Sequence, residues 1–217
     1  MKCIQFTGGM DSTLVAYEQL TTTDDDYVFL FANDKCWAPG YAEASQQYLI
    51  DTLFKDYIDR IEMRVIESEC STNWHVWFHS IAKVISKWNI TELYCGTTQV
   101  YEEARPIEFK NSKRADFRGE SFGGCELHQP IYDLHRHEVV QRYVDHGIID
   151  HIIDTQSCKY MSTIGHVCIE CEQCKDRYIG MRKALEGTEH GWIIEADIYK
   201  RPRFPELVDP NFELIDW

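Results

Sequence analysis

Basic residues are scarce in this chain. Its 217 residues include 22 lysines and arginines against 36 aspartates and glutamates, which gives a formal net charge of −14. Such a charge repels polyanions and argues against duplex DNA or RNA as the main ligand. We therefore expect no direct nucleic-acid partner.

Long hydrophobic runs are also missing. No stretch approaches the roughly 18 apolar residues that a membrane-spanning helix requires. The short apolar start, residues 3–6, runs directly into Gly8 and Gly9, whereas a secretory signal has a longer apolar region that ends in small residues. We expect a cytoplasmic protein with reduced thiols and no membrane contact.

Apolar residues make up 44% of the chain and aromatic residues 13%, which excludes a disordered protein. Short apolar segments alternate with segments of helical periodicity. The expected strands are residues 3–6, 27–32, 60–66 and 92–95, and the expected helices are residues 11–20, 41–54, 74–88, 135–147 and 177–185. This alternation predicts an α/β fold with an open parallel sheet flanked by helices. Residues 97–129 are polar and predict a long loop.

Two adjacent glycines follow the first expected strand. This glycine loop, residues 6–13, consists of Phe6, Thr7, Gly8, Gly9, Met10, Asp11, Ser12 and Thr13. Glycines let the backbone approach a phosphate closely, and the following helix directs its N-terminal N–H groups to the same place. The Asp11 carboxylate would repel a bare phosphate, so we expect it to hold Mg²⁺ that bridges phosphates. The alternative is an ordinary strand-to-helix turn in which Asp11 caps the helix.

Four of the nine cysteines are clustered near the C-terminus. They follow the pattern C-x9-C-x2-C-x2-C and are Cys158, Cys168, Cys171 and Cys174. Four thiolates at this spacing suit a tetrahedral, structural Zn²⁺ site. An iron–sulfur cluster is the competing interpretation, because four cysteines also hold [4Fe–4S].

The glycine loop resembles the SGGxDS signature of the PP-loop ATP pyrophosphatases, which cleave ATP between its α- and β-phosphates. Five of the six positions match, and Thr7 replaces the first serine with another hydroxyl. Together with the cysteine cluster, the loop is similar to the 7-cyano-7-deazaguanine synthase family. Residues 155–158 (Thr-Gln-Ser-Cys) and the segment 130–140 also resemble patterns of that family.

This resemblance implies an ATP-dependent carbon–nitrogen ligase that adenylates 7-carboxy-7-deazaguanine and converts it with ammonia to 7-cyano-7-deazaguanine, as in queuosine-type biosynthesis. It implies a Rossmann-like, PP-loop ATP-binding domain at residues 1–150 and a C-terminal zinc-binding helical subdomain at residues 151–217. Members of the family often form homodimers, so a homodimer is one expected assembly, although the sequence displays no interface for it.

The resemblance also implies roles for individual residues. The whole glycine loop would bind ATP, and the implied catalytic residues are Asp11, Ser12 and Arg136. Asp11 would act with Mg²⁺ on the departing pyrophosphate, and Arg136 would face the phosphates as a cation.

The middle of the chain departs from the family pattern. Residues 33–36 (Asn-Asp-Lys-Cys) stand where the family has Gly-Gln-Arg-His, and the segment after Gly96 also differs. Candidate substrate residues therefore rest on position, because open α/β sheets bind ligands beyond the carboxyl ends of their strands. Trp37 and Tyr101 offer aromatic surfaces there, and Arg105 offers a cation for the substrate carboxylate.

Two other functions share these motifs. A tRNA-modifying PP-loop enzyme would use the same loop, but its polyanionic substrate conflicts with the charge of −14. A non-catalytic relative would bind a nucleotide and a protein partner. The altered middle segments favour this second alternative, whereas the intact Asp11 and Ser12 disfavour it.

Overall fold

A computed structural model of the protein describes residues 1–34, 41–68, 82–107, 116–156 and 171–198. Its centre is a six-stranded sheet in the order β3-β2-β1-β4-β6-β5. The strands are β1 (Lys2–Gln5), β2 (Tyr27–Asp34), β3 (Ile61–Ser68), β4 (Glu92–Tyr94), β5 (Ser121–Phe122) and β6 (Cys125–His128). All neighbouring strands pair in parallel except β5 and β6, which are antiparallel. The predicted α/β fold is confirmed, and the sheet is parallel as predicted except for the β5–β6 pair.

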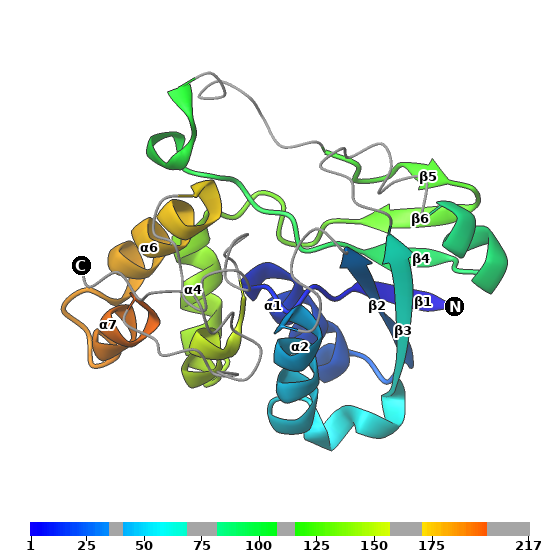
Figure 1. The fold of residues 1–217 in the computed structure, drawn as a ribbon, viewed down its shortest axis with the longest axis horizontal. Helices are drawn as coiled ribbons and strands as arrows, with labels where there is room; N and C mark the ends of the chain where they lie inside the picture. The colour runs from blue at the N-terminus through cyan, green and yellow to red at the C-terminus, as the bar shows by residue number, and fades with distance from the viewer. Residues whose placement is uncertain (35–40, 69–81, 108–115, 157–170, 199–217) are drawn as a thin grey trace, which may run out of the picture.

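Helices lie beside this sheet (Figure 1). The α-helices are α1 (Met10–Thr22), α2 (Tyr41–Thr52), α4 (Arg136–Asp145), α6 (Glu172–Leu185) and α7 (Trp192–Ile198), and the 3-10 segments are η1 (Lys55–Arg60), η2 (Glu102–Ala104) and η4 (Ile149–Asp154). Figure 1 shows α1 and α2 next to the strands and α4, α6 and α7 grouped beyond α1. Within the described ranges, no helix combines the length and the apolar character needed to cross a bilayer.

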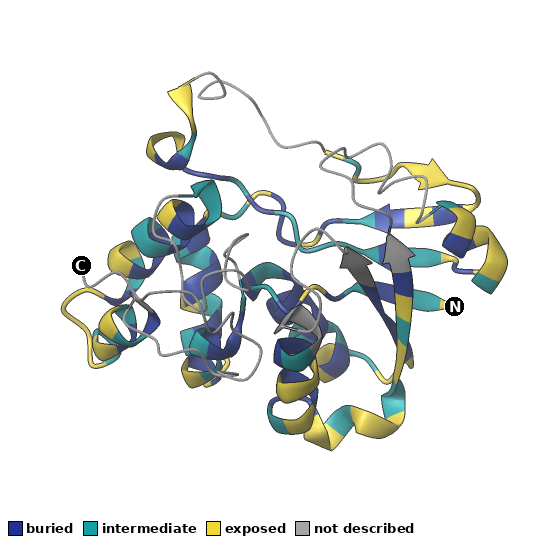
Figure 2. Ribbon diagram, viewed as in Figure 1, coloured by how far each residue is buried: buried dark blue, intermediate teal, exposed yellow. Residues whose placement is uncertain are grey.

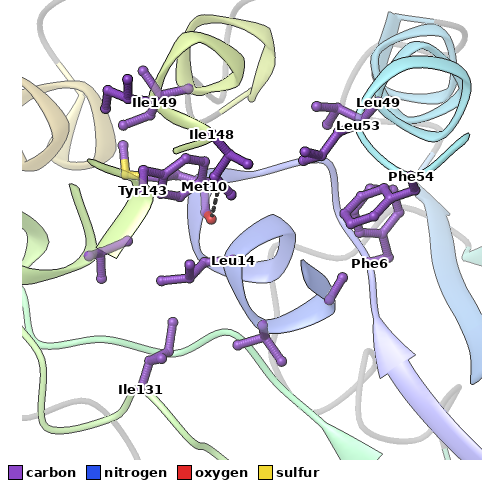
Figure 3. Packing of buried hydrophobic residues seen from close by; sticks show 14 of the residues in the cluster. Phe6, Met10, Leu14, Leu49, Leu53, Phe54, Ile131, Tyr143, Ile148 and Ile149 are labelled. Carbon is purple, nitrogen blue, oxygen red and sulfur yellow. Dashed lines mark hydrogen bonds between the residues drawn. The ribbon is translucent and has the colours of Figure 1, made fainter. Parts of the chain in front are cut away.

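Strand β1 is buried on both faces, as the centre of a parallel sheet should be. Cys3 belongs to a hydrophobic cluster on one face, and Ile4 belongs to a larger cluster on the other. The larger cluster, part of which is drawn in Figure 3, also contains Met181 and Ile193. Helices from both sides of the predicted boundary at residue 150 therefore share one core.

Burial is highest around β1 and α1 and falls toward the rim of the sheet. Figure 2 shows this gradient, with many buried residues along α1. By contrast, η1 contains no buried residue and both residues of β5 are exposed. Strand β1 and helix α1, which the glycine loop connects, are thus among the most buried of the described elements.

The prediction of a continuous loop over residues 97–129 is wrong for residues 121–128, which form the β5–β6 hairpin. Gly123 and Gly124 connect the two strands with φ values of 60° and 84°. A two-residue hairpin turn of type I′ needs such positive values at both positions, and glycine supplies them. Cys125 and Leu127 then point inward and are buried. The sequence carried this signal in its Gly-Gly pair and alternating strand, but both strands are very short.

Other predicted boundaries differ in smaller ways. Helix α6 begins at Glu172 rather than at residue 177, so Cys174 lies inside it. The sequence did not predict η4 or α7. Of the predicted helix 74–88, residues 82–88 are described and helical. The rest of that helix and the tail from residue 201 lie outside the described residues.

Phe54 provides a test of this core. Its side chain is fully buried, and its ring centroid lies 5.7 Å from that of Phe6 (Figure 3). The ring centroid of Phe29 lies 5.6 Å away. We expect Phe54→Ala to lower the free energy of unfolding by about 3–5 kcal/mol, through lost burial and the cavity left behind. Ile58→Ala, at a position in η1 that is 49% exposed, should change it by less than about 0.5 kcal/mol. Urea unfolding curves measure both, and equal losses would contradict this description of the core.

Candidate functional site

The glycine loop lies where the order of the sheet reverses. In the sheet, β2 and β3 follow on one side of β1, and β4 pairs with β1 on its other side. Open α/β sheets bind ligands beyond the carboxyl ends of their strands at such a switch point. The loop follows β1, and Gly96 and Thr98 follow β4, so segments after both strands meet here.

The backbone of the loop takes a form that depends on glycine. Gly8 has a φ of +71°, in the left-handed region that glycine adopts readily. Gly9 is extended and is the N-cap of α1, which places Asp11 in the first helical turn. The alternative interpretation, in which Asp11 caps the helix, is therefore wrong. Because Gly9 makes no side-chain cap, the positive end of the helix dipole is left available to an anion.

The hydroxyls of Thr7 and Ser12 hold the loop in shape. Ser12 Oγ accepts a hydrogen bond from the backbone N–H of Thr7 at 3.1 Å and donates one to the carbonyl of Gly9 at 3.1 Å. The two hydroxyl oxygens lie 3.0 Å apart. Ser12 is only 4% exposed, so it stabilises the loop from its buried side, whereas Thr7 is exposed.

Three other predicted ATP-binding residues point into the protein. Phe6, Met10 and Thr13 are at most 1% exposed, so their side chains pack in the interior of the ligand-free protein. Tyr143 of α4 donates a hydrogen bond to the carbonyl of Met10 at 2.8 Å, which fixes the first turn of α1 against α4 (Figure 3). These buried contacts make the start of α1 rigid.

Arg136 links three helices through two carboxylates. Its Nη1 donates to Asp11 of α1, and its Nε donates to Asp176 of α6 at 2.9 Å. The second oxygen of Asp176 accepts the backbone N–H of Tyr101 at 2.9 Å, and Thr98 lies 3.5 Å from Asp11 Oδ2. The side chain of Arg136 is 7% exposed, that of Asp176 is 1% exposed and that of Asp11 is 20% exposed. Asp11 is thus the member of this network that a ligand can reach.

Electrostatics keep this network charged. Burial alone would lower the pKa of the Arg136 guanidinium, but Asp11 and Asp176 outweigh burial and raise this pKa above its ordinary value. One cation between two carboxylates leaves a net charge of −1 beside the glycine loop. The Mg²⁺ expected from the sequence stays a prediction.

Two glycines allow the close packing that brings these parts together. A Cβ on Gly96 would lie 2.5 Å from the backbone nitrogen of Ser12, so the segment after β4 rests directly on the first turn of α1. A Cβ on Gly180 would overlap the side chain of Arg136, so α6 rests directly on α4. The site depends on the absence of side chains at both positions.

The segment before the cysteine cluster is fastened to the same loop. The backbone N–H of Gln156 donates to the carbonyl of Gly8 at 2.7 Å. Arg177 of α6 donates to Thr155 Oγ1 at 2.8 Å and forms two hydrogen bonds, at 2.8 and 2.7 Å, with Asp197 of α7. All three of these side chains are buried. The two ends of the cysteine segment, near residues 156 and 171, are thereby held by the core.

The structure places one of the three predicted substrate residues close to this network. Tyr101 is 7% exposed, its hydroxyl is hydrogen-bonded to Nδ1 of His137 at 2.5 Å, and its ring stacks on His135 at 5.3 Å. Arg105 follows η2 and is half-buried, and Trp37 lies outside the described residues. A substrate-binding role for these three residues stays a prediction.

Two of the four predicted metal ligands are described. Cys171 is the N-cap of α6, and Cys174 lies one turn further on and is 5% exposed. Cys158 and Cys168 lie outside the described residues. Among the residues that are described, no group of three or more histidine, cysteine or acidic side chains is placed to hold a metal. The four-cysteine site therefore stays a prediction.

Sequence reasoning missed Asp176 and Gln156 as parts of the site. Asp176 and Gly180 are four residues apart on α6, a spacing that puts both on one helix face, where both contact Arg136. This spacing was the only available signal. The contact of Gln156 is made through the backbone, which no residue pattern reports.

Comparisons with known proteins add no assignment. No protein-family model matches the chain, and no curated protein matches it.

The network of Arg136, Asp11 and Asp176 predicts that two arginines of α4 contribute very differently to the free energy of unfolding. We expect Arg136→Met to lower the free energy of unfolding by about 3–5 kcal/mol, because it leaves two carboxylates without their shared cation. Arg142→Met is the control, since Arg142 is 39% exposed in its ion pair with Glu18 and should contribute about 1 kcal/mol or less. Denaturant unfolding measures both variants. Similar small losses would show that the Arg136 network does not stabilise the fold.

Proposed function

We propose that this protein is an ATP pyrophosphatase of the PP-loop type and acts as a carbon–nitrogen ligase. Its proposed reaction converts 7-carboxy-7-deazaguanine, with ammonia, to 7-cyano-7-deazaguanine. The observation that carries the ATP part is the position of the glycine loop and Asp11 at the switch point of the sheet, at the uncapped start of α1. The deazaguanine substrate rests on the sequence resemblance alone.

The proposed chemistry activates a carboxylate twice. A carboxylate oxygen attacks the α-phosphorus of ATP, pyrophosphate leaves, and an acyl adenylate forms. Ammonia then attacks the acyl carbon, AMP leaves, and an amide results. The amide oxygen is adenylated by a second ATP, and loss of AMP and protons leaves the nitrile. Each turnover therefore consumes two ATP and releases two AMP and two pyrophosphates.

The residues of the loop would bind and orient the nucleotide. The backbone of Gly8 and Gly9 and the first-turn N–H groups of α1 would hold the phosphates. Asp11 would hold the Mg²⁺ that accompanies ATP and neutralises the leaving pyrophosphate. Arg136 would contribute by fixing the Asp11 carboxylate, since a direct phosphate contact would require the Asp11–Arg136 pair to open. Ser12 would act through the shape of the loop.

A zinc ion would have a structural role in this proposal. Cys171 and Cys174, one turn apart at the start of α6, suit two thiolates on one ion, and Cys158 and Cys168 would complete the set. The bound ion would anchor the segment that leads from Gln156 to α6. It would take no part in the chemistry.

A second candidate function is supported by one observation. Asp11 is already ion-paired with Arg136, as it would be in a non-catalytic relative that binds a nucleotide and a protein partner. Such a protein would bind ATP without cleaving it. The turnover experiment below distinguishes the two candidates.

The catalytic proposal predicts the products of ATP cleavage. Purified protein with ATP, Mg²⁺, ammonium and 7-carboxy-7-deazaguanine should release AMP and pyrophosphate and yield the 7-cyano compound, detected by mass spectrometry. Asp11→Asn should lose at least 100-fold in turnover, on the order of the loss of one preorganised electrostatic group, while it remains folded because Arg136 keeps Asp176.

Asp51→Asn is the matched control, because Asp51 is exposed and hydrogen-bonds only Gln47 among the described contacts of its carboxylate. Its turnover should equal that of the wild type. Release of ADP and phosphate would exclude the PP-loop chemistry. ATP binding without any cleavage would favour the non-catalytic candidate.

The metal proposal predicts one zinc per chain. Elemental analysis should find it in the wild type and in Cys125→Ser, a buried cysteine of β6, but not in Cys174→Ser. Loss of the ion should raise amide hydrogen exchange across α6, because metal binding and local folding are linked. Iron with acid-labile sulfide, or protein without any metal, would contradict this prediction.

A further inference from the structure

Gln46 is a buried polar side chain without a hydrogen-bond partner among the described residues. It lies in α2 and is 1% exposed, yet neither its Nε2 nor its Oε1 is hydrogen-bonded within the described structure. Its neighbours in sequence are satisfied: Ser45 donates to the carbonyl of Asp154 at 3.0 Å, and Gln47 donates to Asp51 at 2.8 Å. Buried amides are almost always paired, and an unpaired one is costly, so Gln46 requires an explanation.

Its position points to the glycine loop. Cγ of Gln46 lies 3.0 Å from the place that a Cβ on Gly8 would occupy, and the backbone nitrogen of Gln46 lies 3.8 Å from the same place. The amide group is attached directly to this Cγ, so it lies next to the loop. Gln156, whose backbone binds Gly8, also has a buried Oε1 without a hydrogen bond. Three unsatisfied amide atoms, two of Gln46 and one of Gln156, thus belong to residues that contact one glycine.

Packing does not explain the choice of glutamine here. A methionine or leucine would fill similar space without two unsatisfied atoms. The assignment of oxygen and nitrogen in the amide does not matter either, because both atoms are unpaired and exchanging them changes nothing. What glutamine adds is a neutral donor, which can serve a phosphate without adding to the repulsion from the Asp11 and Asp176 carboxylates.

We propose that Gln46 is a phosphate-contacting residue that determines the affinity for the nucleotide held by the glycine loop. Its Nε2 donates to a phosphate oxygen, and its Oε1 can accept from a water of the accompanying cation. This inference rests on the proposed ATP-binding function and adds a residue outside the loop to it. The phosphate would supply the hydrogen-bond partner that the described residues do not offer to this amide.

This proposal predicts that Gln46→Met weakens nucleotide binding without lowering the stability of the ligand-free protein. In Gln46→Met the buried amide is replaced by an apolar side chain of similar volume, so the ligand-free protein should be as stable as the wild type or more stable. The dissociation constants of Mg·ATP and of Mg·pyrophosphate should both rise about tenfold, since one hydrogen bond to a charged acceptor is lost. Gln47→Met, the exposed neighbour, should change neither quantity.

Calorimetric titration and urea unfolding of the full chain test these expectations. Gln46→Glu provides a second variant, because it keeps the size of the side chain but places a carboxylate near the phosphates, and should weaken binding further than Gln46→Met does. A purely structural role would lower stability in Gln46→Met and leave affinity unchanged, which would overturn the inference.

The outcomes separate this inference from the proposed function. If the wild type binds neither Mg·ATP nor Mg·pyrophosphate, the proposed function fails. If the wild type binds both and Gln46→Met binds both equally well, the inference alone fails, and a buried water satisfies the amide. If affinity falls for Mg·ATP and not for Mg·pyrophosphate, the assignment of Gln46 to the phosphates is overturned.

Discussion

The Arg136 guanidinium, held between carboxylates of two other helices, is the interaction on which the site depends. It joins α1, α4 and α6 through Asp11 and Asp176. Buried ions are expensive to remove from water, so the two most buried members, Arg136 and Asp176, depend on each other. A shift of α1, α4 or α6 would therefore lengthen or break at least one of these hydrogen bonds.

The surrounding packing restricts the freedom of this network. Gly96 and Gly180 let backbone and side chains come closer than any other residue would allow. Further along α1, Glu18 accepts from Arg142 at 3.0 Å and lies 3.2 Å from Nε2 of His146, which ties α1 to α4 a second time. A carboxylate placed on rigid elements in this way is positioned before any ligand arrives, as efficient charge stabilisation requires.

The sequence predicted the parts of the fold that have strong local signals. The strand at residues 27–32 is apolar throughout, and the glycine loop has both its glycines and its following helix in order. It did not predict β6, whose four residues carry too little periodicity, or Asp176, which meets its partner only because α6 folds back on α4. Gln46 could not be identified either, since its significance lies in the hydrogen bonds that its buried amide does not make.

The order of the site's parts along the chain determines when the site can form. Asp11 precedes Arg136 by 125 residues, and the backbone of Gln156 binds the carbonyl of Gly8. Contacts between such distant residues form late in folding, because the intervening chain must be closed into a loop first. As synthesis proceeds from the N-terminus, β1 and the glycine loop leave the ribosome long before their partners do. A ligand that needs the complete site can therefore stabilise only a chain whose C-terminal helices are already made, and would act on the last stage of assembly.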